Sequence, residues 1–267
     1  MAGGLETYEF PVGKLAKKLK DNAKIPVVLV ACGSYSPITY LHLRMFEMAK
    51  DYFEELDEYE LIGGYFSPVS DFYQKEGLVQ AVHRVKMCEL ATDDGSDWLM
   101  VDEWESLQHE YQRTAVVLDH FHYELNKDGG VVCGIDNDAV IQRKKIHVLL
   151  LAGGDLIKSM EMPGVWELTD LRHILKNYGC MVVERTGTDL WEVLLSHDVL
   201  YEFRKNIHVV KQAFYNDISS TKVRMFVKRK KNIKYLLPDS VIDYIYDNKL
   251  YTGNITKKRD YLSLEMD

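Results

Sequence analysis

The chain has 267 residues, with 41 acidic and 33 basic side chains and a formal net charge of −8. This length suits one large α/β domain or two small ones, and the acidic balance disfavours a general nucleic-acid binder. Four isolated cysteines without a CxxC pair favour buried thiols over a zinc or disulfide framework. The sequence contains no run of about 18 apolar residues, so we expect no membrane span.

Residues 1–25 are predicted to be an N-terminal extension. Their LAKKLK stretch could form a short amphipathic helix. We favour a solvated lead-in over a membrane anchor, because stable anchoring normally takes two signals. A single domain is predicted over residues 26–253, followed by a C-terminal tail at 254–267.

Apolar runs and helical periodicities alternate along the predicted domain, which is typical of a parallel sheet with helices on both faces. Strands are predicted at 27–31, 60–66, 97–101, 146–151, 179–184 and 206–210. Helices are predicted at 38–56, 79–91, 106–125, 156–160, 168–177, 190–196, 220–230 and 240–248. The fold class is therefore α/β, a Rossmann-like three-layer fold with a central parallel sheet of about six strands.

One stretch lacks any period. Residues 126–139, NKDGGVVCGIDNDA, are rich in Gly and Asp. We predict a flexible surface loop near 126–144 between two halves of the domain.

The first candidate site follows the first predicted strand, in GSYSPITYLH, residues 33–42. Gly33 lets a phosphate or nucleoside approach the backbone, and Pro37 suits the first turn of a helix. The free N–H groups of that turn favour an anion, which His42 can reach. A plain strand–turn–helix connection with a surface histidine explains these residues equally well, so the pattern alone leaves both open.

The second candidate site is NDISSTKVR, residues 216–224. Its cap-type residues predict a helix start, where Thr221 and Arg224 share a face and can bind an anion. The stretch from Asp217 to Asp239 contains Lys and Arg but no acid between its ends. A solvated basic face is the better interpretation for Lys228–Lys231 only.

A third turn and one aromatic residue complete the candidates. Gly153-Gly154-Asp155 follows a strand and resembles a ribose contact, but it matches neither the P-loop nor the dinucleotide fingerprint. Trp166, after Pro163-Gly164, could present its face to a flat heterocycle. On the residues alone, a place in the core is favoured.

Two motifs of this sequence, in the same order along the chain, resemble the signatures of a known family. GSYSPITYLH resembles the nucleotidyltransferase signature G-x-F-x-P-x-[HT]-x-x-H, and ISSTKVR resembles the second signature, I-S-S-T-x-[IVL]-R. With SPVSDFYQKEGL, VDEWESLQ, LAGGDLI and PGVW, the chain from about Val27 to Tyr251 is similar to eukaryotic, fungal-like nicotinamide/nicotinate mononucleotide adenylyltransferases.

The resemblance implies an enzyme of NAD biosynthesis, a nucleotidyltransferase. It would transfer the adenylyl group of ATP to nicotinamide or nicotinate mononucleotide, giving NAD or deamido-NAD plus pyrophosphate. The mononucleotide phosphate would attack in line. Mg²⁺ or another divalent cation would be held mainly by the ATP phosphates, without a metal site built from protein ligands.

The resemblance also assigns residues. The catalytic residues would be His42 and Arg224. The ATP-binding residues would be Gly33, Ser34, Tyr35, His42, Gly153, Asp155, Asn216, Ser220, Thr221, Lys222, Val223 and Arg224. The mononucleotide-binding residues would be Ser34, Tyr35, Lys75, Tyr111, Thr114, Val165, Trp166 and Arg185. The chain departs from the family pattern at Ser36, Thr39, Glu76 and Tyr111. Glu76 stands where many members have Lys, and Tyr111 where animal members often have Trp.

The expected partners are small-molecule nucleotides and further copies of the chain in a homo-oligomer, without nucleic acid or membrane. The expected location is the cytoplasm, the nucleus or both. Two alternatives stay open. A related transferase could act on another phosphorylated small molecule, against which PGVW and VDEWESL argue. A nucleotide-binding chaperone or sensor could lack catalysis, against which the presence of both His42 and Arg224 argues.

Overall fold

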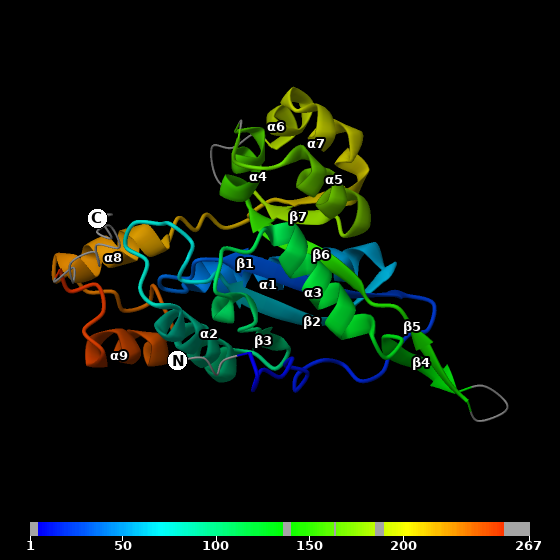
Figure 1. Ribbon diagram of the computed structural model, residues 1–267, viewed down its shortest axis with the longest axis horizontal. Helices are drawn as coiled ribbons and strands as arrows, with labels where there is room; N and C mark the ends of the chain where they lie inside the picture. Colours follow the sequence, from blue (N-terminus) through cyan, green and yellow to red (C-terminus); the bar gives the residue numbers. More distant parts are fainter. Residues whose placement is uncertain (1–4, 136–139, 163, 185–189, 254–267) are drawn as a thin grey trace, which may run out of the picture.

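The computed structural model describes residues 5–135, 140–162, 164–184 and 190–253 (Figure 1). Its centre is a six-stranded sheet in the order β3-β2-β1-β6-β7-β8, and every pairing in it is parallel. This confirms the predicted Rossmann-like α/β fold. No helix within the described ranges is long and apolar enough to cross a membrane.

The strands are β1 Ile25–Gly33, β2 Tyr59–Pro68, β3 Leu99–Val101, β6 His147–Gly153, β7 Cys180–Val183 and β8 Ile207–Val210. The first two extend further than predicted, through the pair Gly33–Pro68. Pro68 fits at the end of β2 although it lacks an N–H group. The carbonyl of Gly33 instead accepts from the N–H of Val69 at 3.0 Å.

Helices cover both faces of the sheet (Figure 1). On one face lie α1 Tyr40–Leu56, α2 Ala81–Gly95, α8 Ser220–Lys228 and α9 Asp239–Asp247. On the other lie α3 Thr114–Asn126, α4 Gly154–Glu161, α5 Leu168–Asn177, α6 Leu190–Ser196 and α7 Asp198–Glu202. An apolar core lies on each face of the sheet, and β1 contributes to both because its side chains alternate. Val27 and Leu29 pack with α1 on one face, whereas Val28 and Val30 pack with α3 on the other.

Two predictions about elements are wrong. The range near 126–144 holds an antiparallel hairpin, β4 Val131–Ile135 and β5 Ile141–Lys144, instead of a loop alone. Its β5 side chains are largely exposed, so the sequence carries no alternation of apolar and polar residues that would reveal the strand. The helix predicted at 106–125 is split into a 3-10 turn, η1 Glu105–Leu107, and α3. The residues between η1 and α3 are not helical. Among them, the Glu110 carbonyl accepts a hydrogen bond from the Ser70 hydroxyl at 3.2 Å.

The N-terminal residues 5–24, here called the N-terminal strap, pack along the sheet. The N–H of Ala16 donates to the Ile62 carbonyl and that of Leu19 to the Val132 carbonyl, both at 2.9 Å. Leu19 is only 3% exposed. The Leu15 side chain packs against Gly63, where an added Cβ atom would lie only 2.8 Å from a Leu15 methyl group. The strap is therefore only in part the solvated lead-in that the sequence predicts: many of its residues are exposed, whereas Leu19 is buried and Phe10, Leu15 and Ala16 pack against the core.

Candidate functional site

The strand order creates a crevice between β1 and β6. Helix α1 leaves β1 toward one face, and α4 leaves β6 toward the other, so the carboxyl ends of these strands are open between them. A cavity of about 260 Å³ lies there, and its lining includes Gly33, His42, Lys75, Gly153 and Asp155. The structure thus brings together the first and third turns that the sequence singled out.

The turn after β1 is supported from beneath by Tyr35. This residue has a φ of 41° and a buried ring, whose hydroxyl donates to the Ala31 carbonyl at 2.6 Å. A Cβ on Gly33 would lie 2.8 Å from the ring, so Gly33 is required for this packing. Burial raises the pKa of the Tyr35 hydroxyl well above its usual range. Tyr35 can therefore serve a ligand through its backbone, while its side chain fixes the turn.

His42 is oriented by the start of α1. The N–H of Thr39 donates to its Nδ1 at 3.0 Å, and the Thr39 hydroxyl lies 2.8 Å from the same nitrogen. A nitrogen that accepts from an N–H group carries no hydrogen, so the neutral ring holds its proton on Nε2. The Tyr35 ring packs edge-on against the imidazole, with centroids 5.3 Å apart. His42 therefore presents Nε2–H as a hydrogen-bond donor.

Helix α8 is bonded directly to the turn after β1. The Ser220 hydroxyl donates to the Pro37 carbonyl at 2.8 Å. Arg224 donates through Nη1 to the Ser36 carbonyl at 2.9 Å and through Nη2 to Thr221 Oγ1 at 3.3 Å. The two predicted anion sites are thus one continuous structure, and the guanidinium is held in place before any ligand arrives.

The loop after β2 closes against this guanidinium. Gly77 has a φ of 75°, and a Cβ there would lie 2.8 Å from Arg224 Nε. On the same loop, Lys75 Nζ donates to Ser34 Oγ at 3.2 Å. Burial lowers the pKa of Lys75, Arg224 lowers it further, and Asp155 opposes the shift. The cations Lys75 and Arg224 therefore lie close to each other, which suits the binding of two polyanions.

Arg84 is a buried residue that the sequence reasoning missed. Its side chain is fully buried, donating from Nε to the Val79 carbonyl at 2.8 Å and from Nη1 to the Ser34 carbonyl at 3.3 Å. Nη2 pairs with Asp71 at 3.1 Å. Arg84 thus holds the turn after β1 from behind. HRVKMCEL offered only an arginine at helical spacing, which is more often exposed.

The described residues expected at the pyridine ring do not line this cavity. Its described lining includes none of Tyr111, Thr114, Val165 and Trp166. Tyr111 stacks on Tyr73, with centroids 5.6 Å apart, and Thr114 begins α3. The Trp166 Nε1–H group donates to Ser159 Oγ at 3.0 Å, while the ring packs against the core. Arg185, also expected in the site, lies outside the described residues.

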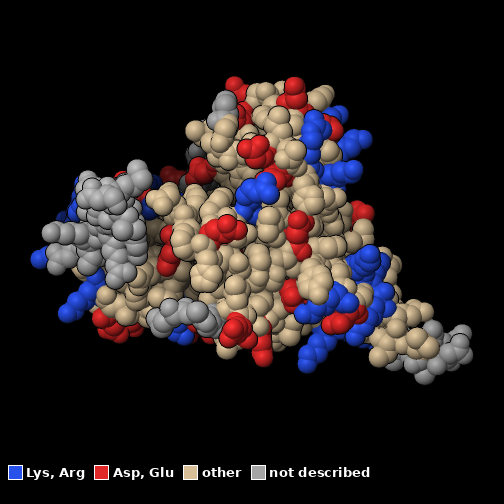
Figure 2. All heavy atoms as spheres, viewed as in Figure 1, with Lys and Arg blue, Asp and Glu red and all other residues tan. Residues whose placement is uncertain are grey.

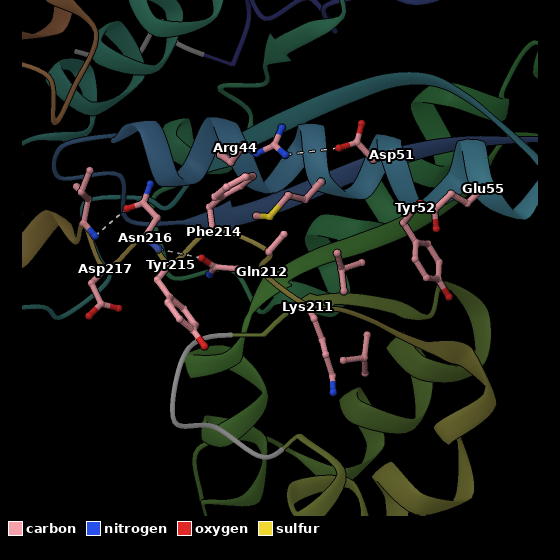
Figure 3. A pocket seen from close by; sticks show the side chains of 15 residues that line it. Arg44, Asp51, Tyr52, Glu55, Lys211, Gln212, Phe214, Tyr215, Asn216 and Asp217 are labelled. Atoms are coloured by element: carbon pink, nitrogen blue, oxygen red, sulfur yellow. Dashed lines mark hydrogen bonds and ion pairs between the residues drawn. The ribbon is translucent and has the colours of Figure 1, made fainter.

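Asn216 lines a second, larger groove of about 720 Å³ between α1 and the segment after β8 (Figure 3). Its Oδ1 accepts from the Ile218 N–H at 3.0 Å, and its own N–H donates to Gln212 Oε1 at 3.2 Å. Gln212 also lines the smaller cavity, so the two hollows are neighbours. Figure 3 shows that the exposed aromatic residues Phe214 and Tyr215 project from this segment.

Lys222 and Val223 serve helix α8 itself. Lys222 Nζ donates to the Asp217 carbonyl at 3.2 Å, and its backbone N–H donates to Oγ of the cap residue Ser219. Val223 is fully buried, and its N–H donates to the Ser219 carbonyl at 3.0 Å.

Figure 2 shows lysine and arginine side chains at the α8 end of the molecule, with acidic side chains spread over the middle of the same face.

A buried carboxyl group lies at the carboxyl end of β2. Glu105 is 2% exposed, and its Oε2 accepts from the Ser67 hydroxyl. Burial raises the pKa of Glu105 to about 8, and Asp102 adds to the rise, whereas the bond from Ser67 opposes it. Glu105 is therefore largely protonated at neutral pH, which suits its surroundings.

This pKa predicts a pH-dependent stability. Below pH 8 the folded chain keeps a proton that the unfolded chain loses above about pH 4 to 5, so raising the pH across this window destabilises the fold. As the pH rises, we expect the free energy of unfolding of the wild type to fall by up to about 1.4 kcal/mol per pH unit relative to that of Glu105→Gln, because glutamine does not titrate. Urea denaturation at pH 6, 7 and 8 measures this. A difference between the two proteins that does not change with pH would contradict the prediction.

The described ranges contain no group of three or more His, Cys, Asp or Glu side chains that could hold a metal ion. Asp155 is the carboxylate in the lining of the 260 Å³ cavity. A single carboxylate together with phosphate oxygens is a common arrangement for Mg²⁺. The donor set therefore fits an ion that arrives with a phosphate ligand.

Known proteins resemble this chain over most of its length. The Cytidylyltransferase-like family matches residues 30–226. The chain is 59% identical over 247 residues to Nicotinamide/nicotinic acid mononucleotide adenylyltransferase 2 of Saccharomyces cerevisiae, covering 92% of this chain and 62% of that protein. It therefore spans about three fifths of that relative. Nicotinamide/nicotinic acid mononucleotide adenylyltransferase of Oryza sativa is 44% identical, covering 86% of this chain and 89% of the relative.

A solved structure has the same fold. The nicotinic acid mononucleotide adenylyltransferase of Plasmodium falciparum superposes with a TM-score of 0.58 at 18% identity, covering 86% of this chain and 98% of that one. The strand order, the range matched by the family model and the identity to the Oryza relative all indicate the same family. The chain belongs to the Cytidylyltransferase-like family and, within it, to the nicotinamide/nicotinic acid mononucleotide adenylyltransferases.

Proposed function

We propose that the chain transfers the adenylyl group of ATP to nicotinamide mononucleotide or nicotinate mononucleotide. The products are NAD or deamido-NAD and pyrophosphate, which makes the chain an enzyme of NAD biosynthesis. The observation that carries this proposal is the direct bonding of α8 to the turn after β1, which ties Arg224 to the turn that leads to His42 in the lining of the crevice. The names of the relatives that match almost the whole chain support the choice of substrate.

The reaction needs a phosphate oxygen of the mononucleotide to form a bond to the α-phosphorus of ATP while the bond to the β-phosphate oxygen breaks. The main task of the protein is to hold two polyanions in line and to stabilise the charge that develops. His42 Nε2–H donates to the oxygens of the α-phosphate. Arg224, with Ser220, Thr221, Lys222 and the first N–H groups of α8, holds the leaving pyrophosphate.

The remaining assignments follow the two sides of the crevice. Gly33, Ser34 and Tyr35 offer backbone groups at the join of the nucleotides, and Lys75 meets the mononucleotide phosphate. Gly153 and Asp155 face the adenosine, with Asn216 further out in the larger groove. Tyr111, Thr114, Val165 and Trp166 frame the pyridine, and the family resemblance assigns Arg185 to the mononucleotide as well. Val223 supports the helix that presents its neighbours.

A divalent cation such as Mg²⁺ would be held mainly by the ATP phosphates, with Asp155 of the cavity lining as the candidate carboxylate, and would supply neutralisation of the phosphate charge. We also propose a homo-oligomer located in the cytoplasm, the nucleus or both.

The test is pyrophosphate release by the full chain with ATP and Mg²⁺. Nicotinamide mononucleotide, nicotinate mononucleotide and 4′-phosphopantetheine are offered separately. Turnover on either mononucleotide with none on 4′-phosphopantetheine is expected. Turnover on 4′-phosphopantetheine alone would replace the proposal by a related transferase, and ATP binding without any turnover would replace it by a nucleotide sensor.

A further inference from the structure

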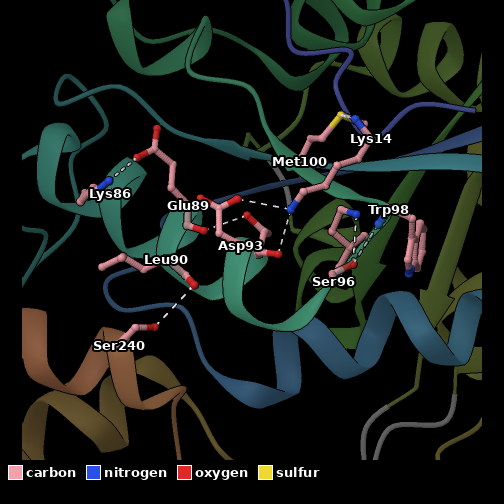
Figure 4. Close-up of polar contacts among 11 residues, drawn as sticks. Lys14, Lys86, Glu89, Leu90, Asp93, Ser96, Trp98, Met100 and Ser240 are labelled. Carbon is pink, nitrogen blue, oxygen red and sulfur yellow. Dashed lines mark hydrogen bonds and ion pairs between the residues drawn. The ribbon is translucent and has the colours of Figure 1, made fainter.

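In addition to its backbone hydrogen bonds, the N-terminal strap contacts the body through side chains at two places that are separate from each other. At one, Lys14 Nζ donates to the Thr92 carbonyl at 3.0 Å and pairs with Asp93 at 3.3 Å (Figure 4). At the other, Phe10 packs on Tyr65 and the hydroxyl of Tyr8 enters a buried polar cluster. The first place is a surface anchor at the end of α2, whereas the second lies beside the chain that leads from β3 to α3.

The buried polar cluster consists of Tyr8, Asp102, Trp104 and His120. Asp102 is fully buried, and its Oδ1 accepts from the Tyr8 hydroxyl at 2.8 Å and from the Trp104 N–H at 3.3 Å. Its Oδ2 lies 3.2 Å from His120 Nε2 but has no hydrogen bond of acceptable geometry among the described residues. Tyr8 is therefore a main partner of a buried carboxylate, which is costly to leave unpaired.

Tyr8 also sets the imidazole of His120. Its hydroxyl hydrogen points to Asp102, so the contact of 3.0 Å between its oxygen and His120 Nε2 requires a hydrogen on that nitrogen. The ring of Trp104 stacks on His120 with centroids 4.2 Å apart and an angle of 8° between the planes. Burial and Asp102 raise the pKa of Tyr8 far above its usual range, so the hydroxyl stays protonated. One hydroxyl thus holds the carboxylate and the stacked pair together.

The same cluster begins the segment that leads to the proposed pyridine contacts. The Trp104 carbonyl accepts from Gln108 Nε2 at 3.0 Å, and Glu105 next to it accepts from Ser67. Further along, Tyr111 stacks on Tyr73, and Thr114 starts α3. Residues 102–114 are therefore held by the loop after β2 on one side and by the N-terminal strap on the other.

We propose that Tyr8 is a positioning residue for the pyridine side of the site, acting through Asp102 and the Trp104–His120 pair on residues 102–114. This inference rests on the proposed function, because the ring contacts of Tyr111 and Thr114 belong to it. It gives the strap a role in substrate binding. Residues of the strap, which precede the range matched by the family model, thereby influence the affinity for the mononucleotide.

The experiment compares Tyr8→Phe with the wild type and with Lys14→Ala, which loosens the strap at the surface anchor only. Tyr8→Phe keeps the ring and removes the hydroxyl. We expect KM for the mononucleotide to rise about tenfold, KM for ATP to stay within about twofold and kcat to change little, as for a misplaced binding segment. Lys14→Ala should leave both KM values unchanged. Unchanged KM values in Tyr8→Phe, or an equal rise in Lys14→Ala, would overturn the proposal.

Amide hydrogen exchange supplies a readout that does not need turnover. Exchange in Tyr8→Phe should accelerate in residues 105–114 and stay as in the wild type in β1 and α8. Acceleration everywhere would mean a merely structural role, and no acceleration in residues 105–114 would overturn the proposal. If the wild type turns over neither mononucleotide, the proposed function fails, and the exchange pattern alone decides whether Tyr8 positions this segment.

Discussion

Replacing His42 by Ala is expected to lower kcat by at least about 10²-fold, the usual loss for one transition-state donor. The reason is geometric: the Thr39 N–H donates to Nδ1, so Nε2 must carry the hydrogen and can donate to the phosphate in every molecule. Alanine offers no donor at this place. Steady-state pyrophosphate release with saturating ATP and mononucleotide measures the change.

The control separates chemistry from stability. His42 also completes the capping box of α1, so its loss costs about 1 kcal/mol of unfolding free energy. His83→Ala removes another half-buried histidine from a first helical turn, one whose Nδ1 contacts Tyr244 at 2.9 Å. This variant should keep its rate when assayed well below its unfolding temperature. A His42→Ala enzyme with the full rate would disprove the role of the imidazole.

The central fold was predictable because its signals are local. The apolar run at 27–31 marked β1 as a strand buried on both faces, and the glycines at the ends of β1 and β6 marked the open ends. Strand order then brings these turns together in any parallel sheet of this kind. The start of α8 was equally readable, because Ser219 and its neighbours are cap-type residues, and Ser219 does accept from the Lys222 N–H.

What the sequence hid depends on contacts between distant residues. At the break between η1 and α3, Ser67 and Ser70 from the end of β2 and the loop after it donate to Glu105 and Glu110. The packing of the strap depends in the same way on a buried carboxylate 94 residues away from Tyr8. Helical period and charge pattern report neither, because both describe neighbours along the chain.

The pyridine side shows the same limit. From the residues alone, Trp166 was favoured as a core side chain, and the family resemblance reversed that interpretation. In the structure its indole packs against the core and donates to Ser159, while Tyr111 stacks on Tyr73. Packing and ligand contact can occur on two faces of one ring, so their roles toward the mononucleotide stay predictions.

Replacing Arg224 by Ala is expected to lower kcat/KM for ATP by about 10²-fold or more, with part of the loss in KM. The guanidinium is bonded to the Ser36 carbonyl and to Thr221, so its position is fixed before ATP arrives. Its loss removes a charge from the proposed pyrophosphate site and also one of the hydrogen bonds that hold α8 to the turn after β1, while the bond from Ser220 remains. Initial rates at varied ATP concentration measure the effect.

Two further variants decide which of these losses matters. Arg224→Lys keeps the charge but cannot bond the Ser36 carbonyl and a phosphate as a planar fork does. If charge dominates, this variant should recover most of the lost kcat/KM, whereas a loss close to that of Arg224→Ala assigns the effect to the fork. Lys228→Ala removes an exposed charge from the end of the same helix and should leave ATP kinetics unchanged. An equal loss in Lys228→Ala would mean that general basicity of α8, and no specific contact of Arg224, attracts ATP.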